Sequence, residues 1–159
     1  MTGPKLLDVM QPLVRQAQSL VARLWRGTTL GVRVIAFDGD GLLLVRHTYV
    51  TGWHLPGGGV HAGETAEAAA RRELLEETGH EADGAARFLG LYFNPVVAGR
   101  DHVAVYHMAA CVAARAFRAN HEIAECRAFP LDRLPEDTTA STRRRLAELI
   151  EGLPPSDRW

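Results

Sequence analysis

The sequence predicts one α/β domain, in which a mixed β-sheet is flanked by helices and is preceded by an amphipathic helix. Three observations support this fold class. The chain has 159 residues, 47% of them hydrophobic, which is the usual size of one domain with one core. Segments with helical periodicity and β-rich runs alternate in the order helix, strands, helix, strands, helix. The sequence contains neither internal repeats nor low-complexity tracts.

The first predicted element is an amphipathic helix within residues 1–26. Apolar residues recur at steps of four and three from Leu6 to Leu24, which places them on one face of a helix. Basic side chains around it would also suit a membrane surface, but Asp8 and two glutamines dilute that pattern. We therefore expect the helix to pack on its own domain, residues 27–159, or on a second copy of the chain in a homodimer.

The central segments are predicted to be strands around one helix. Two β-rich runs are separated by the turn sequence DGDG, which is typical of a hairpin. A glycine-rich loop and a helix over about residues 65–78 come next, followed by strands in the runs ARFLGLYFN, HVAVYHMAACVA and EIAECRAF, the last ended by Pro130. The final helix, in TASTRRRLAELIEG, begins after Ser or Thr and ends before Gly152.

Composition excludes several classes of partner. A net charge of −1 and a pI near 6.7 give no global attraction to nucleic acid or to anionic lipid, so we expect no nucleic-acid partner.

Cys111 and Cys126 lie in apolar runs and are expected to be structural thiols of a reducing compartment. The start of the chain lacks a signal-peptide pattern, and no run approaches the roughly 20 apolar residues of a membrane span. We expect a cytoplasmic protein.

The helix over residues 65–78 carries a crowded set of acids. At about 100° per residue, Glu73, Glu76 and Glu77 continue the face that begins with Ala69 and Ala70. Small residues mark the side of a helix that packs on its domain, where like charges repel unless a cation holds them. Carboxylate oxygens suit Mg²⁺ or Mn²⁺, so the pattern predicts a divalent cation site.

The loop before this helix supports the same prediction. Gly57, Gly58 and Gly59 allow close backbone approach and positive φ, and Thr65 suits the N-cap of the helix. Such a loop can direct carbonyls at a metal or amides at a phosphate. Two alternatives remain at this point. The glycines would equally serve a tight turn, and the acids could belong to a solvated helix with i,i+4 ion pairs.

Loop and helix together resemble the Nudix box, the phosphate-binding loop–helix–loop of the Nudix hydrolases. The fixed positions of that signature are matched by Gly58, Glu64, Arg72, Glu73, Leu74, Glu76, Glu77 and Gly79. His80 departs from it, since the family usually has an aliphatic residue there, which affects the helix exit more than the metal site. The resemblance is strongest over residues 57–80 and extends more loosely over residues 29–151.

The resemblance implies the α/β/α sandwich of the family and a metal-dependent pyrophosphohydrolase. Its substrate would be a small nucleotide-type molecule, a nucleoside diphosphate linked to another moiety, with Mg²⁺ or Mn²⁺ as cofactor. Two alternatives are a nucleoside triphosphate pyrophosphatase and a Nudix-like binding or sensor module without catalysis. A module of the second kind would normally have lost a carboxylate of the box, and this box has lost none.

The resemblance also implies roles for the residues of the box. Glu76 and Glu77 would be metal ligands, Glu73 a ligand or the base that acts on water, and Gly57 a ligand through its backbone carbonyl.

Three residues outside this ligand set have implied roles as well. Arg72 would orient the carboxylates and Glu64 would support them. A later loop often supplies another ligand or base, for which Glu122 is the first candidate and Glu125 the second. A solvated strand end is the alternative for Glu122.

Substrate contacts are predicted from flat and basic side chains near the box. Aromatic rings can stack on a base, and arginines can bind phosphate or ribose. The candidates are Tyr49, Trp53, Tyr92, Phe93, Arg33, Arg46 and Arg100, of which Tyr92 or Phe93 is expected to be core. Pro95 lies about fifteen residues past the box, where family members that act on ADP-ribose often have proline, so ADP-ribose is slightly favoured. Three nearby histidines lack the spacing of a zinc site.

Overall fold

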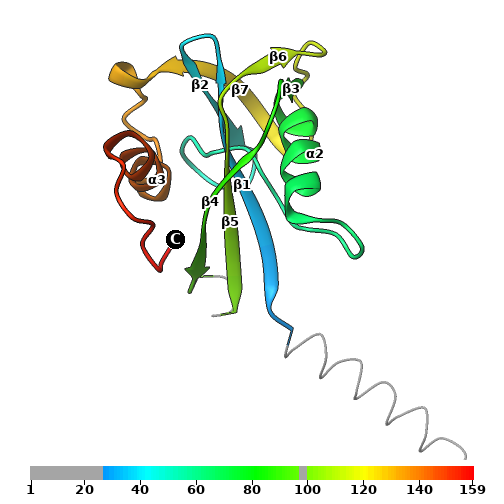
Figure 1. Cartoon of the computed structure of the whole chain (residues 1–159). Helices are drawn as coiled ribbons and strands as arrows, with labels where there is room; N and C mark the ends of the chain where they lie inside the picture. The colour runs from blue at the N-terminus through cyan, green and yellow to red at the C-terminus, as the bar shows by residue number, and fades with distance from the viewer. Residues whose placement is uncertain (1–26, 97–99) are drawn as a thin grey trace, which may run out of the picture.

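A computed structural model describes residues 27–96 and 100–159 of the chain (Figure 1). The amphipathic helix predicted within residues 1–26 lies outside the described residues. Neither helix of the described ranges is long and apolar enough to cross a membrane. The elements are β1 (Thr29–Asp38), β2 (Gly41–His47), α2 (Ala66–Thr78), β3 (His80–Ala82), β4 (Arg87–Asn94), β5 (Asp101–Met108), β6 (Cys111–Ala113), β7 (Ile123–Pro130), the 3-10 helix η1 (Leu131–Arg133) and α3 (Ala140–Glu151).

Five strands form one mixed sheet in the order β4-β5-β1-β2-β7. The neighbours β1 and β5 run parallel, whereas the other pairs are antiparallel. Helix α2 covers one face of this sheet and α3 covers the other (Figure 1). The expected α/β/α sandwich with a mixed sheet is therefore confirmed.

The two faces of the sheet carry two core layers because successive side chains of a strand point to opposite sides. Along β1, Val32, Val34 and Ala36 pack under α2 with Leu74. Ile35 instead belongs to the layer under α3, which also holds alternate leucines of β2 and the α3 residue Leu146. The strand alternation thus fixes which side chains can reach α2 and which can reach α3.

Both helices end as the sequence predicts. The Thr65 hydroxyl accepts the backbone N–H of Ala68 at 3.1 Å, and Gly79 closes α2 with a φ of 77°. Thr139 caps α3, and Gly152 closes it with a φ of 66°. These positive φ values favour glycine, which is the reason that glycine marks both helix ends in the sequence.

One predicted strand is wrong in its extent. The run HVAVYHMAACVA divides into β5, which ends at Met108, and β6, which begins at Cys111. Strand β6 leaves the main sheet and pairs with β3, whose three residues, His80–Ala82, were not predicted as a strand. A polar three-residue segment has no periodic pattern, so only its tertiary partner shows that it is a strand.

The two thiols occupy apolar surroundings, as expected. Cys111 is buried and Cys126 is half-buried against the core layer under α2, and neither forms a disulfide. Burial raises the pKa of both thiols, that of Cys126 to about 12. These are structural positions rather than reactive ones.

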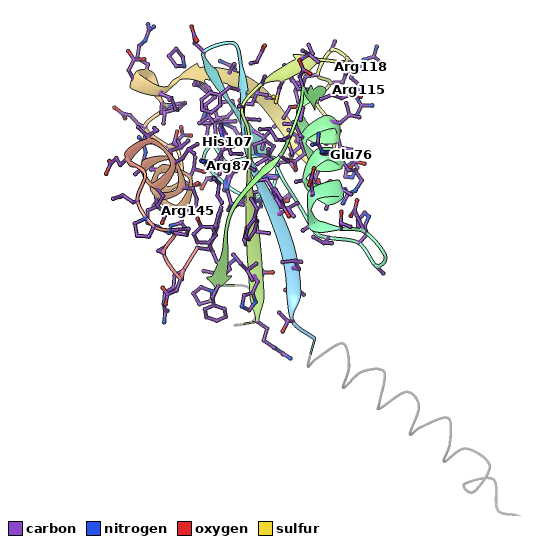
Figure 2. The ribbon with its side chains drawn as sticks, viewed as in Figure 1. Glu76, Arg87, His107, Arg115, Arg118 and Arg145 are labelled. Carbon is purple, nitrogen blue, oxygen red and sulfur yellow. The ribbon has the colours of Figure 1, made fainter. Side chains whose placement is uncertain are left out.

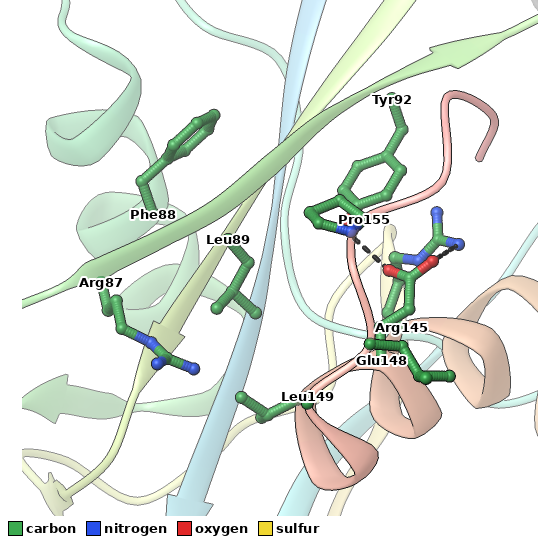
Figure 3. A pocket seen from close by; sticks show the side chains of 10 residues that line it. Arg87, Phe88, Leu89, Tyr92, Arg145, Glu148, Leu149 and Pro155 are labelled. Atoms are coloured by element: carbon green, nitrogen blue, oxygen red, sulfur yellow. Dashed lines mark hydrogen bonds and ion pairs between the residues drawn. The ribbon is translucent and has the colours of Figure 1, made fainter.

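Helix α3 is fastened through a buried arginine. Arg145 is 1% exposed, its guanidinium carbon lies 3.9 Å from the ring centroid of Tyr92, and it donates to Glu148 at 2.8 Å (Figure 3). It also donates to the backbone carbonyl of Arg158 at 2.9 Å. Burial is the main cause that lowers its pKa. Arg145, Tyr92 and Glu148 line a pocket of about 310 Å³ between β4 and α3, on the sheet face opposite to α2. Arg145 therefore joins α3, β4 and the segment after α3.

Candidate active site

The glycine-rich loop follows β2 in the chain and lies between β1 and β2 in the sheet. These two strands pair directly only beside their turn, and residues 53–60 run between them farther along. Backbone N–H to carbonyl bonds hold the loop to both strands, from Val32 to Gly58 at 2.8 Å, from Val34 to Pro56 at 2.9 Å and from Val45 to His54 at 2.9 Å. The loop is consequently a fixed part of the sheet, and its free backbone groups have defined positions.

Two glycines of this loop are required by close contacts. Gly57 has a φ of 143°, and a Cβ there would collide with the backbone carbonyl of Val32. A Cβ on Gly58 would lie 2.6 Å from a carboxylate oxygen of Glu73. The side chain of Glu73 thus occupies the space that a larger residue would fill, which places a carboxylate directly against the loop.

Helix α2 presents two of its three central acids to the protein. Glu73 is 9% exposed and Glu77 is 7% exposed, on the same side as the buried Ala69 and Ala70. The side chain of Glu76 is 54% exposed. The expectation that all three carboxylates share the alanine face is therefore wrong for Glu76, whose position about 80° from the centre of that face leaves it at the helix edge.

Arg72 is the centre of the ion pairs around α2. Its guanidinium donates to both carboxylate oxygens of Glu64 at 2.9 and 3.0 Å, to Glu73 at 2.6 Å and to Glu76 at 3.2 Å, and to the carbonyl of Gly59 at 3.0 Å. The bonds to Arg72 are the main cause that lowers the pKa of Glu64 to about 2, and those from Glu64 raise the pKa of Arg72. Arg72 thereby fixes the loop and the carboxylates of Glu73 and Glu76 relative to one another.

Glu77 is a buried acid beside the loop. It accepts the backbone N–H of Gly57 at 2.8 Å. Burial raises its pKa to about 7, the Gly57 N–H and the charge of Arg33 oppose this rise, and the charges of Glu73 and Glu122 add to it. Arg33 reaches the same place, since its guanidinium donates to the carbonyls of Gly57 and Leu55. A positive group is thus already drawn to the carbonyl that was predicted to bind metal.

The donor set of this region suits a hard divalent cation. Buried carboxylates next to one another repel, and a cation among them would remove that repulsion. Within residues 27–96 and 100–159, no three His, Cys, Asp or Glu side chains converge on one point that could hold a metal. Arg72 draws Glu73 and Glu76 to itself, while Glu77 turns toward Gly57. Binding of a cation would therefore require these carboxylates to exchange partners.

The structure separates the two later candidates. The charge of Glu122 contributes to the raised pKa of Glu77, and its backbone carbonyl accepts the N–H of Thr48 at 3.0 Å, so Glu122 lies near the acids of α2. Glu125 instead pairs with Arg127 at 2.6 Å and with Arg46 at 3.6 Å. Glu122 adjoins the site, whereas Glu125 is engaged elsewhere.

Tyr49 offers a flat surface at the edge of the site. Tyr49 is 69% exposed. It lines a pocket of about 390 Å³ together with His47 and Arg46. The preceding residue, Thr48, donates its backbone N–H to the carbonyl of Glu122 at 3.0 Å, so Tyr49 lies near that acid, and burial and then the charge of Glu122 raise the pKa of Tyr49. The ring of His47 contacts that of Tyr49 in a tilted arrangement with 5.2 Å between ring centroids, and burial lowers the pKa of His47 to about 4. The ring surface beside the acids is thus neutral.

The other predicted substrate residues lie in different surroundings. Trp53 is 3% exposed within the core layer under α3, and the guanidinium carbon of Arg46 lies 4.8 Å from its ring centroid. Trp53 therefore offers no free face to a substrate, and its prediction as a binding residue is wrong. Arg46 also pairs with Asp137 at 3.0 Å. Tyr92 is core, as expected, at 1% exposure. Pro95 is exposed after β4, and its role stays a prediction.

Two arginines near α2 were not among the predicted residues. Arg115 and Arg118 line a pocket of about 430 Å³ together with Glu76 (Figure 2). The segment AARAFRAN, which contains them, has no periodic apolar pattern and lies far from the box in sequence. Their spacing of three residues in a loop was the available signal, and it is too common to identify a site by itself.

The comparisons with known proteins agree with this geometry. The family model described as NUDIX domain matches residues 27–150. The chain belongs to the NUDIX domain family. It is 43% identical over 76 residues to a Bacillus subtilis (strain 168) protein named "Putative 8-oxo-dGTP diphosphatase", a match that covers 47% of this chain and 50% of that protein. The chain spans about half the length of the curated relatives that it matches.

Solved NUDIX structures share the fold. A MutT NUDIX hydrolase from Burkholderia pseudomallei is 25% identical, with a TM-score of 0.65 over 76% of this chain and 97% of that one. An ADP-ribose pyrophosphatase from Streptococcus suis is 26% identical, with a TM-score of 0.58 over 84% of this chain and 96% of that one. The family predicted from the box is therefore confirmed.

Proposed function

We propose that this NUDIX protein hydrolyses a phosphoric anhydride bond of a small nucleotide-type substrate with the help of a divalent cation, Mg²⁺ or Mn²⁺. The observation that carries the proposal is the pair of buried carboxylates, Glu73 and Glu77, held against the backbone of Gly57 and Gly58. A charged pair of this kind is costly to bury unless a cation joins it. The names of the relatives support the same class of reaction.

The proposed cation ligands are the carbonyl of Gly57 and the carboxylates of Glu73, Glu76, Glu77 and Glu122. When bound, a divalent cation neutralises charge on the phosphates and makes water more acidic. The protein supplies oxygen ligands from a fixed loop, a rigid helix and a later turn, so the ligands need little reordering of the backbone.

Glu73 is the proposed base that takes a proton from the attacking water. Its carboxylate lies against Gly58 and is ion-paired to Arg72 at 2.6 Å. Arg72 acts as a positioning residue, because it is fastened to Glu64 through two bonds and so fixes the direction of Glu73. Arg33, which donates to the Gly57 carbonyl, is the proposed contact to a substrate phosphate.

The base of the substrate is proposed to stack on Tyr49, whose exposed ring adjoins the acids. Two substrate classes remain in view. Relatives carry the names of an 8-oxo-dGTP diphosphatase and an ADP-ribose pyrophosphatase, and the sequence preference for ADP-ribose depends on Pro95 alone. A sensor module that binds nucleotide without hydrolysis is the alternative of a different class.

Product release from a panel of substrates tests the proposal. The panel contains dGTP, 8-oxo-dGTP, ADP-ribose and a sugar nucleotide, each with Mg²⁺, with Mn²⁺ and with EDTA. We expect cation-dependent hydrolysis that falls at least roughly a hundredfold in Glu73→Gln and Glu77→Gln, since removal of a charged ligand or base costs several kcal/mol. Glu125→Gln is the matched control and should retain turnover. Binding of these compounds without any hydrolysis would instead support the sensor module.

A further inference from the structure

A basic pocket adjoins the C-terminal end of α2. It has a volume of about 430 Å³, and its lining includes Glu76, Gly79, Arg115, Arg118 and Asn120. Figure 2 shows Glu76, Arg115 and Arg118 on the same side of the molecule, beside α2. Glu76 lines this pocket and is also a proposed cation ligand, so the pocket shares one residue with the candidate active site.

The loop that forms this pocket is fixed at both ends. At its start, the carbonyl of Gly79 accepts the backbone N–H groups of Ala114 at 2.9 Å and of Arg115 at 3.0 Å. At its end, the Asn120 side chain accepts the N–H of Glu122 at 2.8 Å. The loop therefore extends from the end of α2 to the acid that adjoins the site, and its arginines have a defined place.

The pocket carries positive charge that nearby acids do not neutralise. Arg115 donates to the carbonyl of Leu75 at 3.2 Å, where the end of α2 holds only partial negative charge. Arg118 forms no side-chain hydrogen bond or ion pair with another described residue. Glu76, the acid of the lining, already pairs with Arg72 at 3.2 Å and is a proposed cation ligand. Two guanidinium groups thus face the pocket without a carboxylate of their own.

We infer that Arg115 and Arg118 bind a further phosphate of the substrate, beyond the two phosphates that a cation at Glu73 and Glu77 would contact, and that the substrate is a nucleoside triphosphate. This inference rests on the proposed function. Guanidinium groups are well suited to phosphate oxygens because their donors form a planar fork. The uncharged terminal ribose of ADP-ribose would leave both arginines without an anion.

Calorimetric titration with non-hydrolysable methylene analogues of dGTP and dGDP, in the presence of Mg²⁺, tests the inference directly. The wild-type protein should bind the triphosphate analogue at least roughly tenfold more tightly than the diphosphate analogue, as expected for charge-assisted bonds to one more phosphate. Arg118→Gln should lose most of that difference while its affinity for the diphosphate analogue changes less than about twofold. Arg118→Gln removes no other contact, so it carries the test even if Arg115→Gln disturbs the end of α2.

The control is Arg133→Gln, which removes an exposed arginine of η1 and should leave both affinities unchanged. Equal affinity of wild-type and Arg118→Gln for the triphosphate analogue would overturn the inference. Turnover of ADP-ribose without turnover of any triphosphate would overturn it as well and would leave the proposed function intact. Arginine-dependent triphosphate binding without hydrolysis of any substrate would support the inference and contradict the proposed function.

Discussion

Replacing Glu77 with Gln should stabilise the protein when no metal is present. In the folded protein, burial is the main reason that the pKa of Glu77 rises from its ordinary value of 4.5 to about 7. The folded state therefore binds more protons than the unfolded state between these two pH values, and the free energy of unfolding falls as the pH rises through this window. Glutamine has nearly the same shape and no charge, so it removes this pH-dependent loss. Its side-chain oxygen can still accept the N–H of Gly57.

The magnitude follows from the difference between the two pKa values. Each pKa unit corresponds to about 1.4 kcal/mol, so at pH 8 the charged, 7% exposed carboxylate destabilises the metal-free fold by about 3 kcal/mol. Because roughly 2–4 °C of Tm accompanies each kcal/mol in a domain of this size, Glu77→Gln should melt about 6–12 °C above wild type at pH 8. At pH 5 the carboxylate is mostly protonated in the fold, and the difference should fall to about 1 kcal/mol or less.

Urea unfolding in EDTA at pH 5 and pH 8 measures the difference in the free energy of unfolding, and thermal unfolding under the same conditions measures the difference in Tm. Glu67→Gln is the matched control, since Glu67 lies on the same helix, is half exposed and pairs with Arg71 at 3.0 Å, so its loss should change stability by less than about 0.5 kcal/mol. Addition of Mg²⁺ should raise the Tm of wild type more than that of Glu77→Gln. Equal stability of Glu77→Gln and wild type at pH 8 in EDTA would refute the reasoning, as would a gain that is the same at pH 5.

Gly58→Ala should destabilise the fold by about 1–3 kcal/mol and lower turnover, because the new Cβ would meet the Glu73 carboxylate at 2.6 Å; thermal melts beside activity assays check this. Arg145→Leu should cost about 3–5 kcal/mol in urea unfolding, because it removes a buried guanidinium that joins three segments and leaves Glu148 without its ion-pair partner; a loss below 1 kcal/mol would contradict the role given to this residue. Glu64→Gln should lower turnover by about tenfold, as Arg72 loses its two-bond anchor. The pKa of Glu64 is lowered to about 2, so its pairing is lost only as the pH falls through that value, and the pH profile of Glu64→Gln between pH 5 and 9 should match that of wild type.

Local features of the chain were readable from the sequence because they depend on neighbouring residues. The turn between β1 and β2, the caps of α2 and α3, and the box from Gly58 to Gly79 all follow from side chains within a few positions of one another. Hydrogen bonds of caps and the conformational freedom of glycine act over that distance. The sequence was therefore sufficient for the fold class, the family and the identity of the carboxylate helix.

Other features were decided by segments that meet only in the tertiary structure. Helical geometry gave Glu73, Glu76 and Glu77 similar directions. The glycine-rich loop of residues 53–60, however, buries only Glu73 and Glu77. The flat ring of Trp53 suits stacking on a base, yet packing under α3 places it in the core. The pairing of β3 with β6 and the pocket of Arg118 join segments about thirty or more residues apart. Burial, and with it the pKa of an acid such as Glu77, depends on what the rest of the chain places over a side chain, which the order of residues along one helix does not contain.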